Sequence, residues 1–133
     1  MYFDRDEIEA RMNEAGKKRE PFLFAVDFEG QKGIFVPRPL SGRDVLFDIK
    51  GTSNTRPTRT HPGDYRFDAF PEGYEIYQQR FHRVMEGLRR GDSYLTNLTI
   101  QTPLQCSLSL EDIFQFSRAP YRLCIPDQWV CFS

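Results

Sequence analysis

The clearest periodic pattern in the chain is a stripe of apolar residues in its second half. Apolar side chains recur every three or four positions from Tyr74 to Leu88, the spacing that lines one face of a helix. Arg89 and Arg90 fall in the last turn, where positive charge suits the helix dipole, and Gly91 follows as a terminating residue. The pattern predicts a helix ending before Gly91 with this stripe buried: Tyr74, Tyr77, Phe81, Val84 and Leu88.

Two further helices are predicted from their capping residues. Asp4 can cap a helix that begins directly after it, because Glu7 stands three residues later, and Gly16 is a plausible end to that helix. The run Ser109–Asp112 resembles a capping box, which predicts a short helix through about Ser117.

Strands are predicted where apolar residues run continuously or alternate. The apolar run 21–28, the turn residues 29–33 and the run 34–36 together predict a hairpin. Residues 93–102 alternate between two faces, with Tyr94, Thr96, Leu98 and Ile100 on one of them. The predicted strands are 21–28, 34–36, 45–49, 93–102, 121–125 and 129–132.

These elements predict an α+β fold with a mainly antiparallel sheet and packed helices, and 133 residues suit one domain, spanning 1–133. Residues 51–69 show no periodicity and are expected to form a long loop inside that domain. The loop could be an anion site, or it could be flexible or covered by a partner. The anion site would use Arg56, Arg59, His61 and Arg66 with the threonine hydroxyls.

Charge and composition narrow the partners and the compartment. A formal net charge of −1 with both signs interspersed argues against nucleic acid and anionic membranes as partners. The sequence contains no apolar stretch of membrane-spanning length, and Met1 leads into charged residues rather than a signal peptide. We therefore expect a cytoplasmic location.

No active site is visible from residue types alone. Cys106, Cys124 and Cys131 lack metal-site spacing from one another and from the histidines, so they are interpreted as reduced structural thiols. His82 and Glu86 border the helical stripe and could serve acid–base chemistry, but partly exposed helix positions are the simpler interpretation.

Sequence motifs add a resemblance to a known family. Behind the predicted helix stand Gly91-Asp92, Tyr94 and then Asn97-Leu98-Thr99, an order typical of chorismate-binding enzymes. The segments 117–121 and 129–133 are similar to two later strands of that family, and Met12-Asn13 with 21–28 is similar to the opening of short component I chains. The chain thus resembles the N-terminal portion of aminodeoxychorismate (para-aminobenzoate) synthase component I.

This resemblance implies an incomplete part of the chorismate-binding fold, the fold of anthranilate synthase component I. Ser133 corresponds to the first residue of the family's Ser-Pro-Glu-x-Phe motif, and the family's catalytic groups lie beyond that point. The resemblance therefore assigns no catalytic residue, no metal ligand and no cofactor to this chain. Mg²⁺ would belong to the intact enzyme, which aminates chorismate for p-aminobenzoate and folate synthesis.

The resemblance also implies partners and an effector pocket. The implied partners are the C-terminal catalytic portion and a glutamine amidotransferase component. Copies of this chain are also expected to associate with one another. Pro120 and Tyr121 match the Pro-Tyr pair of the family's tryptophan pocket. Lys50, in an Ile-Lys-Gly-Thr run, resembles a nucleophilic motif but stands too early in the chain, so a surface lysine is expected. Alternatives are an anthranilate synthase component I fragment and a non-catalytic binding or regulatory module.

Overall fold

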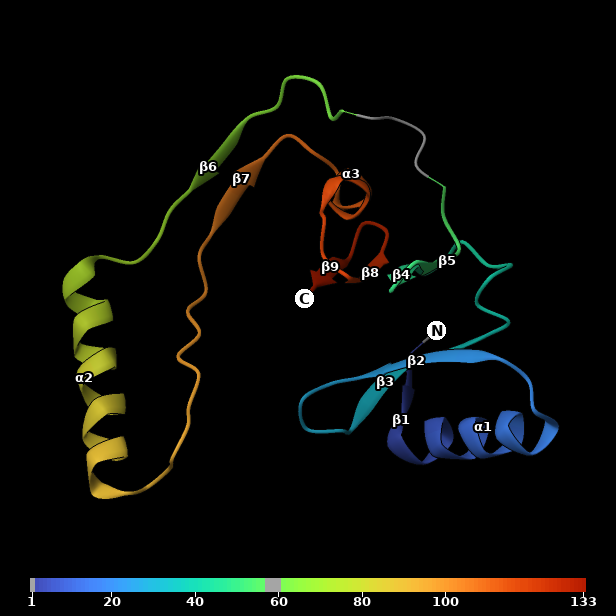
Figure 1. Ribbon diagram of the computed structural model, residues 1–133, viewed down its shortest axis with the longest axis horizontal. Helices are drawn as coiled ribbons and strands as arrows, with labels where there is room; N and C mark the ends of the chain where they lie inside the picture. Colours follow the sequence, from blue (N-terminus) through green and yellow to red (C-terminus); the bar gives the residue numbers. More distant parts are fainter. Residues whose placement is uncertain (1, 57–60) are drawn as a thin grey trace. The chain divides into compact units, whose positions relative to one another are not determined.

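The computed structural model describes residues 2–56 and 61–133, and the three helices and nine strands of this part are shown in Figure 1. The helices are α1 (Arg5–Lys18), α2 (Tyr74–Arg90) and α3 (Leu110–Phe116). The strands are β1 (Tyr2–Asp4), β2 (Phe22–Val26), β3 (Lys32–Pro37), β4 (Leu46–Ile49), β5 (Thr52–Ser53), β6 (Phe67–Ala69), β7 (Leu104–Cys106), β8 (Tyr121–Ile125) and β9 (Trp129–Phe132).

Every strand pairing in the described residues is antiparallel, so the chain is an α+β protein. The strands form three sheets, with the orders β1-β3-β2, β5-β4-β8-β9 and β6-β7. The chain divides into two compact units, Met1–Gly63 with Leu108–Ser133, and Asp64–Ser107. No helix of the described residues has the length and apolar character needed to cross a membrane.

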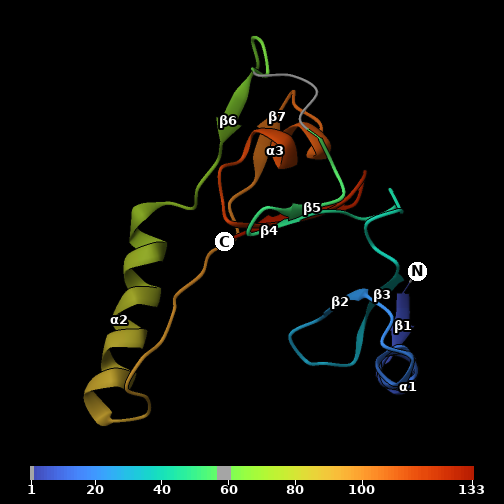
Figure 2. The ribbon, with the colours of Figure 1, turned by 45° about the vertical axis from the view of Figure 1, so that its right-hand side comes forward.

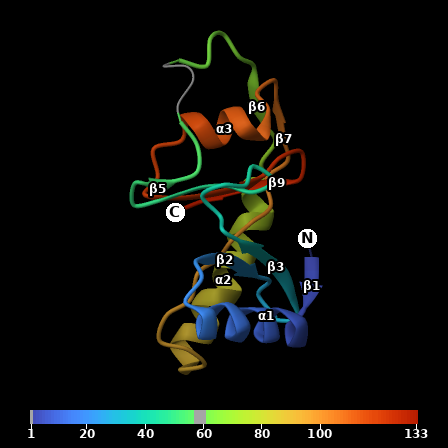
Figure 3. The same ribbon diagram turned by 90° about the vertical axis from the view of Figure 1, so that its right-hand side faces the viewer.

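The first unit is built in layers (Figure 3). Helix α1 packs against β1 and β3 on the outside of the three-stranded sheet, and α3 packs against β8 and β9 on the outside of the four-stranded sheet. The two sheets face each other and bury apolar side chains between them, which excludes water from both inner faces. This core contains Leu23, Ile34, Val45, Phe47 and Ile125.

The predicted caps are present at two of the helices. The Asp4 carboxylate accepts a hydrogen bond from the Glu7 amide at 2.9 Å, and Ser109 and Asp112 form a reciprocal capping box. The end of α1 was predicted wrongly. Gly16 does not stop the helix, because a glycine costs an α-helix only about 1 kcal/mol. The helix instead continues to Lys18 and ends at Arg19, which adopts a left-handed conformation with a φ of 55°.

The second unit consists of the β6-β7 ladder and α2, from which the chain returns to β7 as an extended segment (Figures 1 and 2). The α2 helix is confirmed, but the prediction that its apolar stripe is buried is wrong. None of its residues is buried, and Tyr74 is 72% exposed. Tyr77 and Phe81 are exposed as well, and Val84 and Leu88 are half-buried.

The strand predicted over residues 93–102 is absent, since this segment is irregular and Tyr94 and Leu95 are exposed. The alternating pattern is present, but a strand is stable only when its backbone pairs with another, and this segment joins none of the sheets. The segment 51–69 was predicted to be a long loop, but it contains the short strands β5 and β6 at its two ends. Residues 57–60 of that segment lie outside the described part of the chain.

Candidate functional site

Tyr121, the expected effector residue, opens strand β8 beside the end of β4. It pairs with Ile49 across the ladder and is 42% exposed. Its side chain lines an open cavity of about 290 Å³ between the two sheets of the first unit. Pro120 does not line this cavity, and its carbonyl accepts a hydrogen bond from the Lys50 amide at 2.8 Å.

Lys50 lies next to Tyr121 because it follows Ile49 at the turn between β4 and β5. Its ammonium nitrogen is 5.5 Å from the centroid of the Tyr121 ring, a cation–π contact. The backbone of Lys50 is left-handed, with a φ of 50°, and the residue is exposed. A turn position with an exposed ammonium group matches the surface lysine expected from the sequence.

The lining of the Tyr121 cavity is almost entirely apolar. Arg122 is the charged residue in this lining, and its guanidinium already binds Asp48 and the carbonyl groups at the end of α3. The cavity can therefore accept an apolar group. Positive charge stands beside it in Arg122 and in Lys50 over the Tyr121 ring, but its lining contains no Asp or Glu side chain for the ammonium of a free amino acid. The other lining residues are Leu23, Phe24, Ile49, Leu123, Cys131, Phe132 and Ser133.

A second, larger cavity of about 430 Å³ lies between the sheets near the start of the chain. Two aromatic residues of its wall are joined by a hydrogen bond, in which the Trp129 indole donates to the Tyr2 hydroxyl at 3.0 Å. Tyr2 in turn donates to the Gln128 side chain at 2.9 Å. Sequence reasoning missed this site, because no local pattern brings together residues 127 positions apart.

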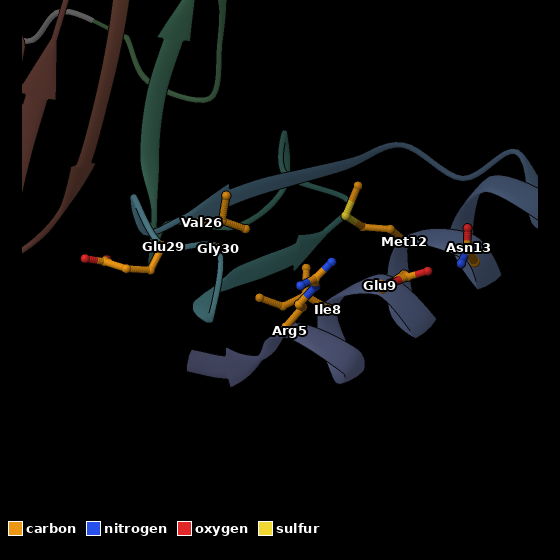
Figure 4. Close-up of a pocket in the computed structure, with 8 residues that line it drawn as sticks. All are labelled: Arg5, Ile8, Glu9, Met12, Asn13, Val26, Glu29 and Gly30. Atoms are coloured by element: carbon orange, nitrogen blue, oxygen red, sulfur yellow. The ribbon is translucent and has the colours of Figure 1, made fainter. Parts of the chain in front are cut away.

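A third cavity, of about 390 Å³, lies between α1 and the β2–β3 turn (Figure 4). Ile8 and Met12 from α1 and Val26 from β2 give it an apolar floor, and Arg5, Glu9 and Glu29 stand around it. The site also contains Asn13, so the Met12-Asn13 pair of the family resemblance forms part of this wall. Its mixed charges suit a small polar ligand.

The thiols of the first unit are poor nucleophiles. Burial raises the pKa of Cys124 to about 11, with a smaller contribution from Glu111, so the thiolate is scarce at neutral pH. Cys131 is exposed, yet desolvation by its apolar surroundings also raises the pKa of its thiol. No group of three or more His, Cys, Asp or Glu side chains in the described residues could hold a metal ion. The residues present thus do not fit a Mg²⁺ site, and we assign the ion to none of them.

The remaining candidate groups are dispersed. His82 and Glu86 are both exposed on α2. Of the possible anion-binding residues, Arg66 pairs with Asp68 of strand β6, which begins directly after Arg66, and the His61 ring accepts a hydrogen bond from the Gly63 amide. Arg59 lies outside the described residues. The described residues therefore show no assembled anion site.

The Gly91-Asp92 pair has a structural role at the end of α2. Gly91 adopts a left-handed conformation with a φ of 84°, which glycine alone takes without steric cost. The Asp92 amide then donates to the Gly87 carbonyl at 3.0 Å, and its carboxylate pairs with Arg90 at 2.6 Å. The motif residues thus end the helix and redirect the chain.

Comparison with known proteins identifies two relatives over most of this sequence. The chain is similar to proteins named PabA-like. It is 42% identical over 122 residues to an uncharacterized PabA-like protein of Haemophilus influenzae, covering 91% of this chain and 37% of that protein. It is 37% identical over 123 residues to the PabA-like protein PM1464 of Pasteurella multocida, covering 91% of this chain and 38% of that protein.

The chain therefore spans little more than a third of the length of the curated relatives that it matches. No protein family model matches the sequence. No solved structure matches it either. Both relatives are named uncharacterized PabA-like proteins.

Proposed function

We propose that this chain is the N-terminal portion of an aminodeoxychorismate synthase component I, acting in the cytoplasm in p-aminobenzoate and folate synthesis. The observation that carries the proposal is the similarity, over 91% of the chain, to relatives whose name refers to para-aminobenzoate synthesis. The motifs at 91–99 and 117–121 favour component I, because their sequences resemble its Gly-Asp-x-Tyr, Asn-Leu-Thr and Ala-Pro-Tyr motifs.

The arrangement of the first unit supports this proposal. Two antiparallel sheets packed face to face, each with a helix outside, would provide part of a chorismate-binding fold. Its cavities contain no paired acid and base suited to chorismate chemistry. In this proposal the chain contributes scaffold and interdomain surface, and a separate polypeptide region contributes the reacting groups.

The intact enzyme would replace the C4 hydroxyl of chorismate with ammonia supplied by a glutamine amidotransferase component. Mg²⁺ would neutralise carboxylate charge and assist departure of the hydroxyl group in that enzyme. The Mg²⁺ ion and the amidotransferase component would both act on the portion of the enzyme that corresponds to the unmatched part of the relatives. The exposed apolar stripe of α2 is a surface that such a portion could cover.

The proposal is tested by complementation between two polypeptides. The part of the Haemophilus influenzae relative outside the matched region is expressed separately and mixed with this chain, chorismate, Mg²⁺ and ammonia. We expect 4-amino-4-deoxychorismate only when both polypeptides are present, and no product from this chain alone. Mixing the same remainder with a scrambled-sequence chain controls for activity of the remainder.

Other outcomes would favour the alternatives. Formation of anthranilate would identify the chain as part of an anthranilate synthase component I. Tight binding of the two polypeptides without turnover would favour a non-catalytic regulatory module. Product formed by this chain alone would contradict the assignment of the reacting groups to another portion.

A further inference from the structure

Strand β2 is an edge strand whose outer side has no partner in the described part of the chain. The three-stranded sheet has the order β1-β3-β2, so β2 pairs with β3 alone. The Asp27 amide donates to the Lys32 carbonyl at 2.8 Å, and the Arg38 amide donates to the Pro21 carbonyl at 3.1 Å. Since hydrogen-bonded residues alternate along an antiparallel strand, the remaining backbone groups of β2 point outward. These are the amides and carbonyls of Phe22, Phe24 and Val26.

The sequence of this edge lacks the features that normally prevent edge pairing. Phe22–Val26 contains no charged residue, no proline and no bulge, whereas unpaired edges in native proteins usually carry such features. Helix α1 packs on β1 and β3, which leaves the outer edge of β2 uncovered. Phe24 is 46% exposed and Val26 is 51% exposed.

The surface beside this edge is also apolar. The Tyr121 cavity and a neighbouring cavity of about 370 Å³ share residues of β2, so the mouth between the two sheets runs along the strand. A contiguous exposed apolar surface of this kind marks an interaction site. Four exposed apolar residues from other elements border it, namely Leu40, Ile49, Tyr121 and Phe132.

We propose that β2 pairs with β2 of a second copy of this chain in an antiparallel dimer, with Phe24 opposite Phe24 of the partner copy. Extended backbone is recognised at such an edge by main-chain hydrogen bonds, and an identical strand presents the same outward groups in the opposite direction. The pairing is two-fold symmetric, so it closes as a dimer and leaves no further β2 edge free.

The charges at the two ends of β2 favour a second copy of this chain as the partner of the open edge, and they favour antiparallel pairing. Lys17–Arg19 precede β2, with Lys18 already paired with Glu14 and Glu20 standing before the strand, and the acidic residues Asp27 and Glu29 follow it, so the two ends keep opposite net charges. Antiparallel pairing places the basic end of one copy beside the acidic end of the other, while parallel pairing would place like charges together. The proposal rests on the β2 edge alone and does not depend on the proposed function.

Sedimentation of the full chain over a hundredfold concentration range tests the proposal. We expect a monomer–dimer equilibrium that Phe24→Lys weakens by about tenfold or more, because an ammonium would enter an apolar pair of strands. Tyr94→Lys is the matched control, since Tyr94 is also an aromatic residue, is fully exposed and belongs to none of the sheets. Phe24→Pro is a second variant. It removes the outward amide without removing a bond to β3, and it should also weaken the dimer.

Amide hydrogen exchange separates the possible occupants of the edge. The Phe22, Phe24 and Val26 amides should become protected as protein concentration rises. A monomer in which these amides exchange freely would overturn the proposal. So would a monomer in which they are protected at every concentration, because another segment of the same chain would then cover the edge. A dimer that Phe24→Lys and Phe24→Pro leave intact would show that the copies associate elsewhere.

Discussion

Arg122 on β8 binds the carboxylate of its cross-strand neighbour Asp48 on β4 and, with the same guanidinium, the open carbonyl end of α3. It donates to the Ser117 carbonyl at 2.8 Å and to the Phe114 carbonyl at 3.1 Å, and it lies over the Phe114 ring. The last turn of α3 contains no basic residue of its own. The strand residue therefore provides the positive charge that a helix C-terminus prefers.

Arg122→Met should lower the free energy of unfolding by about 2 to 4 kcal/mol, because it leaves a mostly buried carboxylate and several carbonyls without a donor. Urea denaturation followed by Trp129 fluorescence measures this change. Lys18→Met is the matched control. Its partner Glu14 is exposed in an i,i+4 pair that solvent screens, so the loss of stability should be far smaller than for Arg122→Met. Equal losses in the two variants would contradict the bridging role of Arg122.

Gly33→Ala should prevent folding of the first unit or cost about 3 kcal/mol or more. A methyl group at this position would lie 2.1 Å from the Ala25 carbonyl oxygen and 3.0 Å from Ile8, where β3 passes between β2 and α1. Gly42→Ala is the control, because no atom lies within 4 Å of its added carbon. Circular dichroism and thermal melting compare the variants. A fully stable Gly33→Ala protein would show that β3 is not packed this closely.

Native-state alkylation should distinguish the two thiols of β8 and β9. Cys124 is buried and its pKa of about 11 lies above the ordinary value of 9.0, so its thiolate fraction at neutral pH is about a hundredfold below that of an ordinary cysteine. We expect iodoacetamide to modify Cys131 before Cys124, as measured by peptide mass spectrometry. Faster modification of Cys124 would contradict its burial.

The same raised pKa makes stability depend on pH in the alkaline range. The folded state favours the protonated Cys124 thiol. The contribution of this thiol to the free energy of unfolding is therefore complete below pH 9 and is lost as pH rises through about 11. Cys124→Ala should remove the part of the alkaline loss of stability that comes from ionisation of this thiol. Urea midpoints for the two proteins measured between pH 8 and pH 11 provide the comparison, and identical pH profiles would contradict the assignment.

Tryptophan should bind weakly, with a dissociation constant above about 1 mM, because the Tyr121 cavity is open and mainly apolar and its lining has no Asp or Glu side chain for the ligand's ammonium. Isothermal titration calorimetry tests this expectation. Tyr121→Ala should then leave the heat signal unchanged. A tight one-to-one complex that Tyr121→Ala abolishes would establish the effector pocket predicted from the family resemblance.

Local signals in the sequence were sufficient for most helices and strands. Asp4 and the Ser109–Asp112 box specify helix starts because a side-chain oxygen satisfies backbone amides within three residues. The strands predicted at 121–125 and 129–132 are likewise present as β8 and β9, which are joined by a turn at Asp127. The end of α1 was misjudged because glycine permits a left-handed cap without requiring one, and Arg19 takes that role instead.

The sequence by itself determined these helices, strands and turns, because caps, turn residues and apolar periodicity act within a few residues of one another. Only the tertiary structure decided which elements meet: the Arg122–Asp48 pair, the Tyr2–Trp129 hydrogen bond, and the close approach of Gly33 to α1. The segment 93–102 is an example in which a local pattern gave a wrong prediction. Its alternation favours a strand, but a strand requires hydrogen bonds to a second strand, and the pattern of one segment does not specify whether such a partner is present.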